Sequence, residues 1–383
     1  MNMNKIKLFY TGFIFFFIFP AVIIGQKSQV FVDEDITYKE GLEFFNKQKY
    51  TVAQEYFKKV IQNSGDEISD IKIDAEYYHA ICALELFHDD SEFLIFDFIK
   101  KHPEHPRTRM AYFQMGRFNY RDKNYEEAIF WFNKIDKYHL DKEDLEEYYF
   151  KLGYSYFAQD NQLQAEKLFY ELLNGETAFA APAIYYYSHI AYERKNYETA
   201  LKGFDRIKDD ETFKLLVPYY IAQIHYVTGK YEKAIDYAAE LAQSENVKRE
   251  AEINRIIGES YFKLGKYEQS LPFLEKFKDK AESYSRNDIF QLGFVYYMTK
   301  EYEKAAKTFS IITNNLDTIT QQAYYYMADC YLKLNDKNSA RLSFQNAGRF
   351  DFLPLIKEDA MFQFAKLTFE LSFSPFNETI NAF

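Results

Sequence analysis

Residues 109–135, RMAYFQMGRFNYRDKNYEEAIFWFNKI, have the pattern of two amphipathic helices joined by a short polar turn. Apolar side chains recur there at three- and four-residue steps, which is the helical period: Tyr112, Met115, Tyr120, Tyr125, Ile129, Phe132 and Ile135. Gly116 lies in the middle of the first helix, where glycine costs about 1 kcal/mol relative to alanine. Ala128 follows twelve residues later, so we expect the two helices to cross closely at these small residues, with Phe132 beside the crossing.

The same spacing recurs along most of the chain. Seven further pairs of small residues stand twelve apart: Gly41/Ala53, Gly153/Ala165, Ser188/Ala200, Ala222/Ala234, Gly258/Ser270, Gly293/Ala305 and Ala328/Ala340. We call the first member of each pair the small position; after Gly116, successive small positions lie 34 to 37 residues apart. A tyrosine stands three residues before the second member in most pairs, with Gln162 and Lys337 as exceptions. A unit repeated at fixed offsets predicts one quasi-linear solenoid rather than several globular domains.

This pattern resembles the tetratricopeptide repeat family, whose unit is a helix-turn-helix of about 34 residues. The resemblance implies an all-α, right-handed superhelical solenoid of about ten repeats, filling residues 36–383. The stretch KHPEHPRTRMAYFQMG (101–116) is similar to a joint in the exported Tol-Pal coordinator and outer-membrane assembly branch of the family. In the second repeat, Glu92 stands twelve residues after Ala80, so we expect a looser joint or a bend there.

The last repeat is incomplete. Residues 375–383, PFNETINAF, contain the start of a second helix with an open apolar face. Because the terminal repeats of a solenoid need a polar outer face, we expect that the chain is the N-terminal fragment of a longer protein.

The first 25 residues differ in kind from the repeats. Lys5 and Lys7 precede an apolar run over residues 8–24, as in a secretory signal peptide, and residues 26–35 form a short segment before the repeats. Cleavage after Gly25 is favoured because that residue is small and Pro20 interrupts the run. The alternative is a short membrane anchor, since roughly 17 apolar residues can span a bilayer. Membrane contact is therefore expected only if the leader is not cleaved.

Charge and cysteine content limit the possible partners. The formal net charge of −11 argues against nucleic acid, which requires a basic face. Cys82 and Cys330 stand two residues after the small positions of the second and ninth repeats. Repeats touch only their neighbours, so we expect both cysteines to be free and buried.

No pattern in the sequence predicts catalysis or a cofactor. There is no glycine-rich phosphate loop, HExxH, GxSxG or CxxC motif. His102 and His105 could ligate a metal, but the prolines beside them favour an inter-repeat turn instead. We therefore expect a non-catalytic protein without cofactor or metal.

The first helices carry the candidate binding surface. Aromatic residues stand three residues before and four residues after most small positions, on one helical face, and the residue directly after the small position varies in kind. We predict that these side chains line the concave groove of the superhelix and bind a protein or peptide: Arg117, Tyr120, Tyr154, Phe157, Tyr185, His189, Tyr192, Tyr219, Gln223, Tyr226, Phe262, Phe294 and Tyr297. The alternative is that the same aromatics pack one repeat against the next.

The resemblance and the leader together imply an exported interaction scaffold in the periplasm of a Gram-negative bacterium, with envelope proteins as partners. A second hypothesis is the sensory input domain of a longer membrane signalling protein. Sequence beyond Phe383 would distinguish them, because further repeats favour the scaffold and a transmembrane helix followed by a signalling domain favours the sensor.

Overall fold

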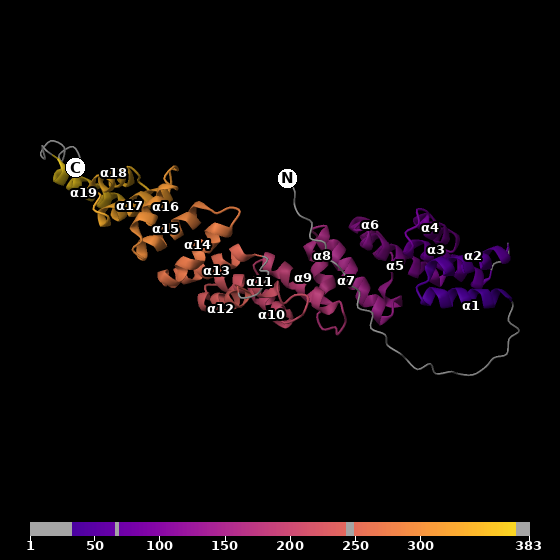
Figure 1. Ribbon diagram of the computed structural model, residues 1–383. Coiled ribbons are helices and arrows are strands. Elements are labelled where there is room, and N and C mark those ends of the chain that lie inside the picture. The colour runs from indigo at the N-terminus through magenta and orange to yellow at the C-terminus, as the bar shows by residue number, and fades with distance from the viewer. Residues whose placement is uncertain (1–32, 66–68, 243–248, 373–383) are drawn as a thin grey trace. The chain divides into compact units, whose positions relative to one another are not determined.

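A computed structural model describes residues 33–65, 69–242 and 249–372. Every regular element in these ranges is helical, with nineteen α-helices and one short 3-10 helix (Figure 1). The all-α prediction is therefore confirmed for the described residues. The chain forms two compact units, residues 1–118 and 119–383, and each is described by itself.

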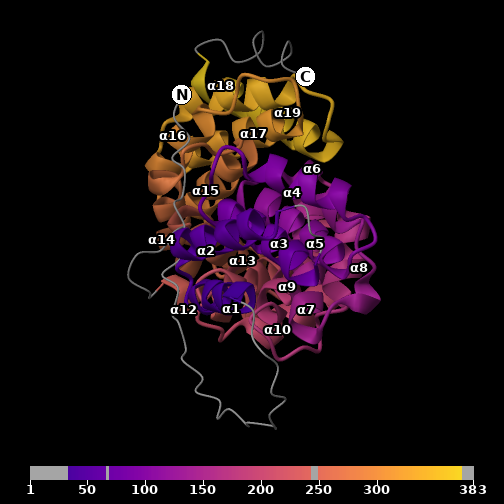
Figure 2. The same cartoon turned by 90° about the vertical axis from the view of Figure 1, so that its right-hand side faces the viewer.

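Unit 1 holds two helix pairs and most of a fifth helix. The helices are α1 (Asp33–Asn46), α2 (Tyr50–Asn63), α3 (Asp70–Glu85), α4 (Ser91–Lys101) and α5 (Pro106–Arg121), whose last residues belong to unit 2. α1 packs against α2, α2 against α3, and α3 against α4, and the two views of the ribbon agree on this order (Figures 1 and 2).

Unit 2 continues the same pattern from α6 to α19. Its helices are α6 (Tyr125–Phe132), η1 (Lys137–His139), α7 (Lys142–Ala158), α8 (Gln162–Tyr170), α9 (Ala180–Glu193), α10 (Tyr197–Ile207), α11 (Val217–Val227), α12 (Tyr231–Ala242), α13 (Glu250–Lys263), α14 (Tyr267–Lys280), α15 (Arg286–Met298), α16 (Tyr302–Ser310), α17 (Thr318–Lys333), α18 (Lys337–Gly348) and α19 (Pro354–Leu371). Each α-helix packs against the next one along the chain, and α11 also contacts α13, α15 contacts α17, and α17 contacts α19. Helix pairs stacked in chain order are the solenoid that the repeat spacing predicts.

The turn inside each repeat has one constant backbone feature. The residue seven after every small position has a positive φ, between 57° and 75°. These residues are Gln48, Phe87, Lys123, Asp160, Lys195, Gly229, Gly265, Lys300 and Asn335. In eight of the nine repeats the second helix begins two residues after this positive-φ residue. The same is true of the two repeats in which Gln162 or Lys337 replaces the usual tyrosine.

The second repeat differs from the sequence expectation by one residue. Ser91, not Glu92, occupies the second small position: Ser91 is 2% exposed, whereas Glu92 is exposed. Ile95 and Phe98 continue the buried face, as Phe57 and Val60 do in the first repeat. The spacing between the two small residues is thus eleven instead of twelve, and the repeat keeps a small residue at its crossing.

The small position makes room for a large side chain of the second helix. A Cβ on Gly293 would lie 2.8 Å from Cε1 of Phe309, and one on Gly153 would lie 3.0 Å from Cε1 of Phe169. Both rings are fully buried. The crossing therefore depends on a ring packed against glycine, in addition to the contact of small residues that the sequence predicts.

A second recurring contact joins one repeat to the next. The buried phenylalanine of a second helix stacks on a tyrosine two residues before the next small position. The four stacked pairs are Phe57–Tyr78, Phe169–Tyr186, Phe204–Tyr220 and Phe309–Tyr326, with ring centroids 5.3, 5.5, 5.3 and 6.0 Å apart. The apolar face of one repeat is therefore covered by the following repeat.

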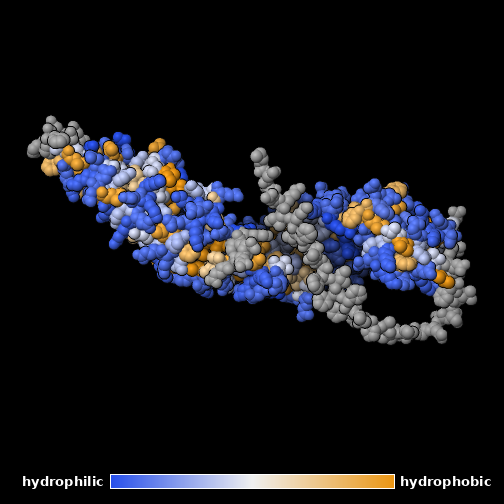
Figure 3. Space-filling model, viewed as in Figure 1, coloured by the Kyte–Doolittle hydropathy of each residue, from blue (hydrophilic) through white to orange (hydrophobic). Residues whose placement is uncertain are grey.

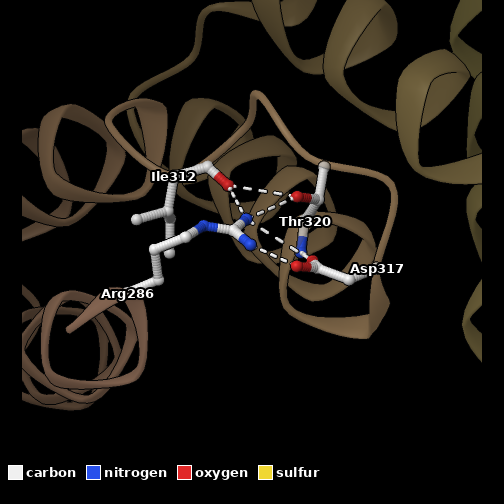
Figure 4. A network of polar contacts seen from close by, with 4 residues as sticks. All are labelled: Arg286, Ile312, Asp317 and Thr320. Atoms are coloured by element: carbon white, nitrogen blue, oxygen red, sulfur yellow. Dashed lines mark hydrogen bonds and ion pairs between the residues drawn. The ribbon is translucent and has the colours of Figure 1, made fainter.

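Polar contacts also fix the joint between the eighth and ninth repeats. Arg286, at the start of α15, donates to the carbonyl of Ile312 at 2.6 Å and to Thr320 Oγ1 at 2.7 Å, and it pairs with Asp317 (Figure 4). Asp317 caps α17 by accepting from the Thr320 amide at 2.8 Å. One guanidinium thus holds the loop between α16 and α17.

Among the described helices, none is both long and apolar enough to cross a membrane. The predicted leader (1–25) and the second helix of the last repeat (376–383) lie outside the described residues.

Two buried serines give opposite predictions for the free energy of unfolding. Ser188 Oγ has no hydrogen-bond partner among the described residues, whereas Ser270 Oγ donates to the Gly258 carbonyl at 2.7 Å across the helix crossing. Ser188→Ala should therefore stabilise the protein, and Ser270→Ala should destabilise it, each by about 1 kcal/mol. Urea unfolding followed by circular dichroism measures both. Equal shifts of the same sign would contradict the assigned contacts.

Candidate partner-binding surface

The predicted groove residues of unit 2 pair across the repeat joints. The residue four after one small position meets the residue directly after the next small position, and we call each such contact a rung. Ring centroids are 5.7 Å apart for Tyr120–Tyr154, 6.0 Å for Phe157–His189 and 5.9 Å for Phe262–Phe294. The structure therefore brings these predicted residues together in neighbouring pairs.

Three rungs are hydrogen bonds. Tyr192 Oη donates to Gln223 Oε1, Tyr226 bonds to the carboxylate of Glu259, and Tyr297 Oη donates to Asp329 Oδ2 at 2.7 Å. Glu259 and Asp329 directly follow a small position, where we expect the residues that make a groove selective, although neither is in the list of predicted site residues above. The position, rather than the residue type, is the sequence signal that identifies them.

The Tyr192 rung extends into a longer polar chain. Gln223 Nε2 donates to Tyr219 Oη at 2.9 Å, and the guanidinium of Arg249 lies 4.6 Å from the centroid of the Tyr219 ring and bonds to its hydroxyl. Burial raises the pKa of Tyr192 to about 12, so its hydroxyl stays protonated and can donate at neutral pH. Tyr219 is only 7% exposed, so little of its side chain is accessible to a partner, and its role is to hold Gln223 in place.

Two other predicted residues, Tyr185 and Arg117, contact aromatic rings outside the rungs. Tyr185 stacks on Phe213 with ring centroids 4.9 Å apart, and Arg117 in unit 1 lies 5.7 Å from the centroid of Phe113. His189 is partly exposed, and burial of its ring lowers its pKa, so the neutral imidazole is favoured. Apart from Tyr219, the predicted residues are half-buried.

Glu259 is a rung carboxylate that is nearly buried, with 7% exposure. Burial raises the pKa of this carboxyl, and the hydrogen bond from Tyr226 and the charge of Arg255 only partly oppose the effect. A buried carboxylate held by one hydroxyl is costly to ionise. The rung between the sixth and seventh repeats is therefore sensitive to pH.

The described residues contain no cluster of three or more histidine, cysteine, aspartate or glutamate side chains that could hold a metal. His102 Nε2 lies 2.7 Å from Glu76 Oε2. Cys82 and Cys330 are free and buried, as predicted, and burial raises the pKa of each thiol to about 12. Neither thiol is therefore activated for nucleophilic attack.

Two family models match parts of the chain. Residues 322–349 match the tetratricopeptide repeat, and residues 193–277 match anaphase-promoting complex, cyclosome, subunit 3. A TPR repeat-containing protein of Methanocaldococcus jannaschii is 27% identical over 125 residues, which are 33% of this chain and 22% of that relative. The match thus spans about a fifth of the relative's length.

Two solved structures are similar to the chain. A tetratricopeptide repeat protein from Parabacteroides merdae has 17% identity and a TM-score of 0.40, over 76% of this chain and 98% of that one. The C-terminal part of a TPR repeat-containing protein from Cytophaga hutchinsonii has 15% identity and a TM-score of 0.40, over 70% of this chain and 98% of that one. The family models, together with the repeat spacing and the stacked helix pairs, support the tetratricopeptide repeat family. Members of this family are usually non-catalytic scaffolds that bind proteins or peptides.

The buried carboxyl of Glu259 predicts a stability change with pH. Because its pKa is raised in the folded state, its contribution to stability is fully present below its unfolded pKa and is lost as pH rises through the folded value. Glu259→Gln should therefore match the wild type near pH 4 and melt at a higher temperature at pH 8. The control is Glu268→Gln, an exposed carboxylate on α14 of the same repeat. A difference between Glu259→Gln and wild type that does not change with pH would contradict the prediction.

Proposed function

We propose that this chain is a non-catalytic scaffold that binds an extended segment of a partner protein along the face formed by its first helices. The observation that carries the proposal is the change of chemistry from rung to rung. Two aromatic rings pack together at Tyr120–Tyr154. A tyrosine hydroxyl donates a hydrogen bond to an amide oxygen at Tyr192–Gln223 and to a carboxylate at Tyr297–Asp329. Half-exposed rungs of different chemistry at regular intervals offer a peptide a distinct contact at each repeat.

The tyrosines suit this role because each combines a large apolar ring with a hydroxyl. The hydroxyls of Tyr192 and Tyr297 already bond within their rungs, so these rings are held in place before a partner arrives. A preorganised surface loses less conformational entropy on binding. Partner recognition by the rungs and packing between the repeats are therefore compatible uses of the same side chains.

We also propose that the protein is exported and works in the periplasm of a Gram-negative bacterium, with envelope proteins as partners. The proposal is supported by the basic and apolar leader at residues 1–25 and by the resemblance of residues 101–116 to exported members of the family. A solenoid stabilised by stacking, with two free cysteines, does not depend on disulfide formation after export.

Site-specific photo-crosslinking tests the binding face without removing the rings. Tyr154 and Phe294 are each replaced by benzoylphenylalanine, with Glu198 and Lys233 on the exposed sides of second helices as controls. We expect partner adducts in intact cells from positions 154 and 294 but not from 198 and 233. Adducts from the control positions alone would place the partner on the second helices and contradict the proposal.

Export has its own test, which is independent of binding. Mass spectrometry of the N-terminus after expression in a Gram-negative host should find Gln26 as the first residue, in the periplasmic fraction. Recovery of the protein with residues 1–25 attached, or in the cytoplasm, would reject cleavage and export respectively.

A further inference from the structure

The joint between the seventh and eighth repeats, which we call the α14–α15 joint, lacks the ring stack. Leu274 occupies the position that Phe309 has in the following repeat, and Gln291 occupies the position of Tyr326. Phe309 and Tyr326 stack at the next joint, whereas a leucine and an amide have no rings to stack. The α14–α15 joint therefore lacks the contact that closes the joint after it.

The amide of Gln291 is buried without a full set of hydrogen bonds. Gln291 is 7% exposed, and its Oε1 has no hydrogen-bond partner among the described residues. Glutamines have the same position in the third and tenth repeats, but there Gln114 accepts from Arg117 and Gln363 donates to Asp359. A buried acceptor without a partner destabilises the closed joint, because opening gives that oxygen access to water.

A gap in the packing lies at one end of the joint. A cavity of about 20 Å³ is lined mainly by apolar side chains: Leu274 and Phe277 of α14, Ile289 and Leu292 of α15, and Ile311 of α16. This volume is enough for one water molecule but not for a side chain, so the lining residues lose part of their dispersion contacts. The surface of unit 2 is mostly hydrophilic, with hydrophobic residues in separate groups (Figure 3). Ile311 is 54% exposed, so the gap lies close to this surface.

The other end of the joint is held by specific contacts. Tyr296 Oη donates to Glu275 Oε1 at 2.7 Å. The ring of Phe294 packs on Phe262 and Tyr267, with ring centroids 5.9 and 5.8 Å apart. The contacts of α15 with the seventh repeat are thus strong toward its C-terminal end and loose toward its N-terminal end.

We propose that the α14–α15 joint is a hinge, in which the end at Leu274 and Leu292 opens while the end at Phe294 and Tyr296 stays closed. Pro272 interrupts the hydrogen bonding of α14 between these two ends, so the helix can bend there. The five residues between α14 and α15 join the helices at the open end and keep the opening small.

The hinge changes the angle between two neighbouring repeats while it leaves the rung between them intact. The Phe262–Phe294 rung belongs to the closed end, so its two rings stay together when the other end opens. A surface that is fixed at its rungs and adjustable between them can follow a partner whose shape does not match it exactly. The hinge itself does not depend on what the rungs bind.

Thiol accessibility in the full chain tests the hinge. Leu292→Cys places a thiol at the gap, and Met327→Cys places one at the equivalent position of the next joint, where the stack is present. Both residues are buried, with 3% and 8% exposure. N-ethylmaleimide should label the thiol introduced by Leu292→Cys about tenfold faster, because local opening exposes it. The buried native Cys330 of α17, followed by mass spectrometry in the same sample, reports global unfolding. Equal labelling rates for the two introduced thiols would overturn the proposal.

Restoring the stack gives the second arm. Gly258 faces Leu274 as Gly293 faces Phe309, so a ring at position 274 meets the same small residue. Leu274→Phe with Gln291→Tyr should therefore slow labelling of the thiol from Leu292→Cys about tenfold, to the rate at the stacked joint. Unchanged labelling in this background would contradict a hinge that depends on the missing stack.

The closed end supplies the matched control. Val295 is fully buried between Phe294 and Tyr296 in the sequence, so the thiol from Val295→Cys should be labelled slowly with or without the restored stack. Labelling there as fast as at Leu292→Cys would show that the whole joint separates, and the hinge would be wrong.

Hydrogen exchange on the unsubstituted protein tests the same opening without any change in packing. The amides of residues 289–292 in α15 should exchange about tenfold faster than those of residues 324–327, the equivalent turn of α17. Equal protection of the two segments would overturn the proposal even if a cysteine variant failed to fold.

Discussion

The stack of a buried phenylalanine on the next repeat's tyrosine is the contact on which this structure depends. A helix pair of about 34 residues cannot bury its own apolar face, so its neighbour must cover it. Phe169 on Tyr186 and Phe309 on Tyr326 do this with nearly parallel rings, 20° and 23° apart. Glycine at Gly41, Gly153 and Gly293 follows from the same constraint, because a Cβ there would press on the phenylalanine ring that makes the stack.

Much of the fold could be predicted because its determinants are local. The crossing residues lie twelve apart and the left-handed turn residue lies seven after the small position, both within one repeat. The ninth repeat keeps the predicted spacing although Lys337 replaces the usual tyrosine, since the turn fixes where α18 begins. The assignment of Glu92 to the second small position is wrong, because a fixed spacing cannot show that the small residues of this repeat lie one residue closer, which only the burial of Ser91 reveals.

The binding surface could be predicted less completely, for a physical reason. A rung joins residues from different repeats, and its chemistry changes at each joint, so no single residue type marks it. Glu259 and Asp329 belong to rungs, yet acidic residues on a helix are ordinarily interpreted as solvated. The sequence pattern places the aromatic residues on one face; only the structure shows that they meet their partners in the next repeat.

This arrangement couples recognition to stability. The side chains proposed to contact a partner also hold successive repeats together, as the chain from Tyr192 through Gln223 to Tyr219 and Arg249 shows. A large truncation there removes packing and a polar partner at the same time, and Gln223 would be left with an unsatisfied oxygen. Loss of binding after such a truncation therefore does not separate the two roles. Substitutions that keep the ring, or probes placed at the ring, do separate them, because they leave the repeat joint intact while changing what the surface presents to a partner.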